Sequence, residues 1–187
     1  MNSYHSRRID FETARGGRPD SSASFTYSSF TDSPPTEWVR EYQQQPLASL
    51  SQLLWYTLDG NLAIIVNGQV SIEEEYFPLF QFANLLAGWL CSRPADGVES
   101  SLVVDDYEHS AKLSLVQQDG VVSMCWPVPT KRWWPAAEGV AAPIVSVACI
   151  PEAAFVAASS AFIQQLQVDV AEQLGLDMSP LLPKASY

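Results

Sequence analysis

The chain has 187 residues, of which 47% are hydrophobic and 17% are charged, and its formal net charge is −11. This length and composition predict a globular domain with a core of its own and exclude a chain that is disordered throughout. The negative charge disfavours nucleic acid and anionic membrane surfaces as partners, and no apolar run approaches the ~20 residues that cross a bilayer. A cytoplasmic protein is therefore predicted.

The negative charge is concentrated in the middle of the chain. Residues 1–35 hold four basic and four acidic side chains and sum to zero. Between residues 41 and 130, eleven carboxylates are accompanied by only two basic residues, Arg93 and Lys112. The part of the chain that is expected to fold therefore carries the whole excess of negative charge.

The three cysteines, Cys91, Cys125 and Cys149, stand far apart in the sequence and inside apolar segments. An odd number without short spacing argues against a disulfide framework and against a zinc site. We expect buried free thiols in a reducing compartment, with no metal and no cofactor.

The first 35 residues are rich in Ser, Gly, Pro and Arg, which predicts a mostly irregular arm before a single α+β domain at 36–187. Within the arm, Ala23–Thr31 contains β-forming residues and could be either an edge strand or part of a loosely held tail. A short helix is predicted to follow, capped by Ser33 or Thr36 and ending near Pro46.

Residues 53–75 are predicted to form a three-stranded antiparallel meander. Its strands are expected at 53–58, 62–66 and 69–75, with tight turns at Asp59-Gly60 and Asn67-Gly68, because such pairs allow the positive φ of a type I′ turn. Val70 and Ile72 of the third strand are expected to point into the core. Pro78 is expected to open an amphipathic helix whose apolar stripe consists of Leu79, Phe82, Leu86, Trp89 and Leu90.

Four more strands and a long helix are predicted in the second half of the chain. The strands are expected at 101–105, 112–116, 121–128 and 143–150, with a turn at Asp119-Gly120 and a loop at 130–142. The helix is expected to run from Glu152 to Leu174 and to end at Gly175. The sum is an α+β fold in which two long helices pack on one antiparallel sheet of about six to seven strands.

Three clusters of side chains are candidates for function. The run Asp105, Asp106, Tyr107, Glu108 and His109 is the densest group of acid–base side chains, and it is either a solvated turn between strands or the edge of a small-molecule site. The other two clusters are Glu73-Glu74-Glu75, which could meet a basic partner or simply be solvated, and the aromatic pair Trp133-Trp134, which could fill the core or contact a partner.

The segment from Trp55 to Leu90 resembles a domain of uncharacterised bacterial proteins. The resemblance rests on a hairpin with Leu62, Ile64, Val66 and Gly68, followed by an apolar helix that ends in Trp89-Leu90, and it covers under a quarter of the chain. In its small size, acidity and lack of catalytic motifs, the chain also resembles immunity proteins that neutralise polymorphic bacterial toxins. That resemblance implies a non-catalytic α+β protein that binds a toxin domain directly.

The first hypothesis is accordingly an acidic immunity or inhibitor protein that masks a cationic toxin domain, such as a nuclease, and is not an enzyme. Carboxylates would mimic the phosphates that such a domain binds, and the expected contact residues are Glu73, Glu74, Glu75, Asp105, Asp106, Glu108, Trp133 and Trp134. Two alternatives remain open: a small-molecule enzyme or ligand-binding domain that uses the cluster at 105–109, and a subunit of an assembly.

Overall fold

The computed structural model describes residues 22–105, 110–127 and 145–184. This part of the chain contains seven strands, four α-helices and a short 3₁₀ helix, η2 (Ser179–Leu181). In chain order the other elements are β1 (Ala23–Asp32), α1 (Thr36–Tyr42), α2 (Leu47–Thr57), β2 (Asp59–Val66), β3 (Gln69–Pro78), α3 (Leu79–Ser92), β4 (Glu99–Asp105), β5 (Ser110–Gln118), β6 (Val121–Pro127), β7 (Val145–Pro151) and α4 (Glu152–Leu174).

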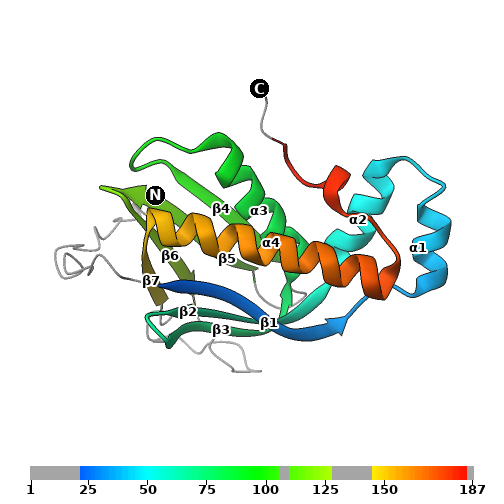
Figure 1. Cartoon of the computed structure of the whole chain (residues 1–187), viewed down its shortest axis with the longest axis horizontal. Helices are drawn as coiled ribbons and strands as arrows, with labels where there is room; N and C mark the ends of the chain where they lie inside the picture. The colour runs from blue at the N-terminus through cyan, green and yellow to red at the C-terminus, as the bar shows by residue number, and fades with distance from the viewer. Residues whose placement is uncertain (1–21, 106–109, 128–144, 185–187) are drawn as a thin grey trace, which may run out of the picture.

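The strands form two antiparallel sheets. Sheet A has the order β1-β2-β3 and sheet B the order β4-β5-β6-β7. The α+β class and the antiparallel pairing are therefore confirmed, but the single predicted sheet is wrong. In Figure 1, α4 runs beside β1 across the molecule, and α1 and α2 gather at one end. Of the two interpretations of Ala23–Thr31, the edge strand is the one observed.

The segment 53–58, which was expected to be a strand, is the second half of helix α2. Its buried residues Leu50, Leu53 and Leu54 follow helical spacing, which becomes visible only when the residues before 53 are included. Because β2 starts at Asp59, Gly60 is not part of a turn but lies within the strand, opposite Phe77. The predicted Asp59-Gly60 hairpin is therefore wrong.

The other two predicted turns are confirmed. Asn67 and Gly68 have φ values of 52° and 76°, and Asp119 and Gly120 have 51° and 76°. Two successive positive φ values are the mark of a type I′ turn, whose twist matches that of the strands it joins. The long helix is also confirmed from Glu152 to Leu174, and Gly175 ends it with a left-handed φ of 64°.

Val70 was expected to face the core but is 57% exposed. The reason is a β-bulge, since Ile64 pairs with Ile72 while the next residue, Ile65, pairs with Val70. One extra residue in β3, Ser71, therefore shifts the alternation, and only Ile72 remains buried.

The helix starts differ from the expected ones. Pro78 is the last residue of β3 and the N-cap of α3, so the helix begins one residue later than predicted. Helix α1 follows Pro35, and no side chain caps it, so the expected capping by Ser33 or Thr36 is wrong.

The core is organised around Phe82 of α3, which is fully buried. Its ring centroid lies 5.8 Å from that of Phe25 in β1, 5.6 Å from Phe77 in β3 and 5.1 Å from Phe162 in α4. Phe77 in turn contacts Trp126 of β6 at 5.3 Å. Since Phe77 belongs to sheet A and Trp126 to sheet B, one aromatic cluster joins both sheets and both long helices.

Strand β1 is fixed to helix α4 by a polar contact at the edge of this core. The Tyr27 hydroxyl donates a hydrogen bond to the carboxylate of Asp169, and Gln165 Nε2 donates to the other oxygen of that carboxylate at 2.9 Å. Burial, together with the bond to Asp169, holds the pKa of Tyr27 far above its ordinary value. The hydroxyl therefore remains a donor at every physiological pH.

Replacing Phe82 by Ala is expected to lower the free energy of unfolding by about 3–5 kcal/mol, because the cavity removes three ring contacts at once. Urea denaturation measures the change. Val168→Ala on the exposed side of α4 is the control and is expected to change stability by about 0.5 kcal/mol or less. A loss below about 1 kcal/mol for Phe82→Ala would show that the aromatic cluster is not the centre of the core.

Candidate protein-binding face

The outer face of sheet A is built by the alternation of its three strands. Thr26, Ala63 and Glu73 stand opposite one another across β1, β2 and β3, and therefore point to the same side. The neighbouring residues Leu62 and Ile64 are buried on the other side, where α3 and α4 pack. At this level of the sheet the outer face consequently presents small and acidic side chains, while Ile65 and the exposed Val70 opposite it lie on the same face nearer the turn at Asn67-Gly68.

A second bulge shapes one end of this face. Gly60 pairs with Phe77 and Leu62 with Glu74, so the single residue Asn61 is opposed by both Glu75 and Tyr76. Tyr76 has a φ of 55°, which is rare for an aromatic residue, and its backbone N–H donates to Asn61 Oδ1 at 3.4 Å. The Tyr76 side chain is 68% exposed. The bulge thus places a solvent-exposed ring next to Glu75 in the chain.

A hollow of about 260 Å³ lies on sheet A. Its lining includes Thr26 and Ser28 of β1, Asn61 of β2, and Glu73 and Glu75 of β3. The hollow therefore combines hydroxyl and amide groups with two carboxylates, which is a surface suited to hydrogen bonding with a cationic group.

The acidic run 73–75 is divided between the two sides of β3. Glu73 and Glu75 are exposed and form no ion pair or hydrogen bond with any residue that the structure describes. Glu74 is half-buried, and its Oε2 accepts a hydrogen bond from Trp126 Nε1 at 2.8 Å. Glu74 therefore serves to join the two sheets, and Glu73 and Glu75 remain available to a partner.

The other predicted contact residues are not brought to this face by the described part of the chain. Asp105 is the last residue of β4, in sheet B. Asp106, Glu108, Trp133 and Trp134 lie outside the described residues, as does His109. Sequence reasoning missed Thr26, Ser28, Asn61 and Tyr76, because an isolated Ser, Thr or Asn on a strand carries no signal until its neighbours across the sheet are known.

The outer face of sheet B has a different character. Lys112 forms an ion pair with Glu99, whose carboxylate also accepts a 2.7 Å hydrogen bond from Ser114 Oγ. These two bonds hold the pKa of Glu99 below its ordinary value. Further along the same face, burial raises the pKa of the Cys125 thiol, and the nearby Cys149 and Glu99 add to the rise.

Residues 22–105, 110–127 and 145–184 contain no group of three or more His, Cys, Asp or Glu side chains that could hold a metal ion. The three cysteines are free and half-buried. Among the described helices, none is both long enough and apolar enough to cross a membrane.

Comparison with other proteins gives no family to which the chain can be assigned. No protein-family model matches it, no curated protein is significantly similar in sequence, and no solved structure is significantly similar in fold.

The structural role of Glu74 can be separated from that of Glu73 by substitution. Glu74→Ala is expected to lower the free energy of unfolding by about 1–3 kcal/mol, because the buried Trp126 N–H loses its acceptor. Glu74→Gln keeps an acceptor oxygen and is expected to retain most of the stability. The matched control, Glu73→Ala, is expected to stay within about 0.5 kcal/mol of the wild type in urea denaturation. Equal effects at 73 and 74 would contradict this division.

Proposed function

We propose that this protein is a non-catalytic immunity or inhibitor protein that binds a cationic toxin domain through the outer face of sheet A. The observation that carries the proposal is the pair Glu73 and Glu75, two exposed carboxylates with no partner among the described residues, beside a hydrogen-bonding hollow. The carboxylates would occupy the positions where the toxin domain binds phosphate. Trp133 and Trp134 remain candidate anchors in this proposal.

The overall charge supports a basic partner. The chain carries a net charge of −11, and the two ion pairs between described residues, Arg93 with Glu152 and Lys112 with Glu99, neutralise few of its carboxylates. A field of one sign accelerates the encounter with a partner of opposite sign and discriminates against acidic proteins. The charge therefore favours fast and selective association with a cationic domain.

The side chains around the hollow support a protein partner in preference to a small molecule. The hollow has about 260 Å³, which is below the roughly 300–1,000 Å³ of typical ligand pockets. Tyr76 projects its ring into solvent at the bulge, and tyrosine is among the side chains most enriched at the energetic centres of protein interfaces. An exposed aromatic ring and an exposed carboxylate on adjacent residues, Tyr76 and Glu75, are both groups that bind a lysine or arginine side chain.

Charge reversal on this face is expected to abolish binding. The variant Glu73→Lys/Glu75→Lys and the wild type are used in parallel to capture proteins from the native host. A basic protein is expected on the wild type and not on the variant. Association of that protein with the wild type is expected to slow at least tenfold between about 50 and 500 mM salt, since screening removes the electrostatic attraction. Stopped-flow kinetics measures the rate.

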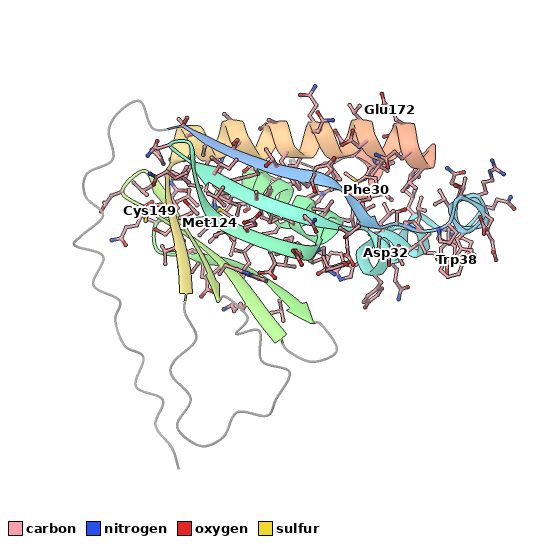
Figure 2. The ribbon with its side chains drawn as sticks, turned by 90° about the horizontal axis from the view of Figure 1, so that it is seen from below. Phe30, Asp32, Trp38, Met124, Cys149 and Glu172 are labelled. Carbon is pink, nitrogen blue, oxygen red and sulfur yellow. The ribbon has the colours of Figure 1, made fainter. Side chains whose placement is uncertain are left out.

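The control variant, Glu41→Lys/Glu172→Lys, changes the net charge equally. Both glutamates are exposed near the C-terminal ends of α1 and α4, where a lysine is favourable to the helix dipole; Glu172 is labelled on α4 in Figure 2. This variant is expected to bind the captured protein within about threefold of the wild-type affinity, because charges outside the contact face contribute little to affinity. Equal losses in the two variants, or association independent of salt, would refute the proposed face.

The inhibitory role has its own test. The captured protein is expected to arrest growth when it is produced alone, and co-production of the wild type is expected to restore growth. Co-production of Glu73→Lys/Glu75→Lys is expected to leave growth arrested. A captured partner that is harmless alone would contradict the immunity function while leaving the binding face intact.

A further inference from the structure

Two of the three thiols lie together on the outer face of sheet B. In the β6–β7 pair, Cys125 stands opposite Val147, and Ser123 stands opposite Cys149. Opposite residues of an antiparallel pair share a face, and so do residues two apart in one strand. Cys125 and Cys149 are therefore diagonal neighbours on one face. Met124 and Ala148 directly precede the two cysteines in the chain, pair with each other, and are buried on the other face. Figure 2 labels Met124 and Cys149 in sheet B.

The diagonal spacing is unsuited to a disulfide. Diagonal neighbours in an antiparallel pair have Cα atoms about 7–8 Å apart, whereas a disulfide requires roughly 4.4–6.8 Å. The Cβ atoms are closer than the Cα atoms, and each Cβ–Sγ bond can turn inward. The two sulfur atoms can therefore approach closely enough for one metal ion to bridge them, since a metal–thiolate bond such as Zn–S is about 2.3 Å long.

The surroundings restrict which ion such a pair could take. Zinc requires four ligands, and the described residues offer no group of three metal-capable side chains. The polar neighbours of the thiols include two hydroxyl groups, since Ser123 Oγ lies 3.8 Å from Cys149 Sγ and Ser114 stands opposite Cys125 on β5. The carboxylate of Glu99 is also near Cys125, but it is bound by Lys112 and Ser114. Two thiolates with no third strong ligand among the described residues select a soft monovalent ion of the type of Cu(I).

We propose that Cys125 and Cys149 form a two-coordinate site for Cu(I). On binding, the S–H bond of each thiol is broken, two S–Cu bonds form, and two protons pass to solvent. The copper enters and remains as Cu(I), so that no oxidant or reductant is required. The site lies on sheet B and does not depend on the function proposed for sheet A.

Competition for Cu(I) tests the site directly. The reduced full-length protein is titrated without oxygen against the Cu(I) complex of bicinchoninate, whose colour reports the ion it loses. The wild type and Cys91→Ser are expected to withdraw one Cu(I) per chain. Cys125→Ser and Cys149→Ser are expected to bind it about 100-fold more weakly or worse, because a single thiolate remains. Undiminished binding in either variant, or no withdrawal by the wild type, would overturn the proposal.

A second probe tests the spacing without any substitution. Phenylarsine oxide joins two neighbouring thiols through its arsenic atom with loss of one water. The wild type is expected to gain one such adduct, and digestion is expected to yield the peptide of Cys125 joined to the peptide of Cys149. An adduct that includes Cys91, or ready formation of a Cys125–Cys149 disulfide with oxidised glutathione, would show that the thiols are not arranged as proposed.

Discussion

The structure depends on one aromatic cluster in which side chains of both sheets meet those of the two long helices. Phe82 of α3 contacts rings from β1, β3 and α4, and Phe77 extends the same cluster to Trp126 of β6. Because rings of this size bury more apolar area than other side chains, they supply much of the driving force for packing the sheets together. Helix α3 contacts β2 and β4, and helix α4 contacts β1, β6 and β7, so both helices help to cover the apolar faces of both sheets.

Each sheet packs one face into the core, and the outer faces of the two sheets differ in chemistry. In sheet A most outward residues are small, polar or acidic, with Val70 as an exposed apolar residue, and in sheet B they include an ion pair and two thiols. The division of the run Glu73, Glu74 and Glu75 illustrates the constraint. The carboxylate of Glu74 accepts a hydrogen bond from the indole N–H of Trp126, whereas Glu73 and Glu75 are exposed to solvent, because strand residues alternate between the two faces.

The candidate faces could be predicted only in part. The excess of carboxylates can be counted in the sequence. The exposure of Glu73 and Glu75 also follows from it, because charged residues at alternate positions of a strand lie on the face that is open to solvent. The hollow does not, because Thr26 and Asn61 are 35 residues apart in the chain and meet only through the pairing of β1 with β2. The closeness of Cys125 and Cys149 likewise depends on the register of β6 and β7.

The sequence by itself determined the features that rest on local preference: the turns at Asn67-Gly68 and Asp119-Gly120, the apolar stripe of α3, and the extent of α4 with its glycine end. Only the tertiary structure decided that 53–58 is helical, that the strands divide into two sheets, and that bulges at Ser71 and Tyr76 shift which side chains are exposed. The physical reason is that turns and helix ends depend on a few neighbouring residues, whereas register and sheet division depend on contacts between distant segments.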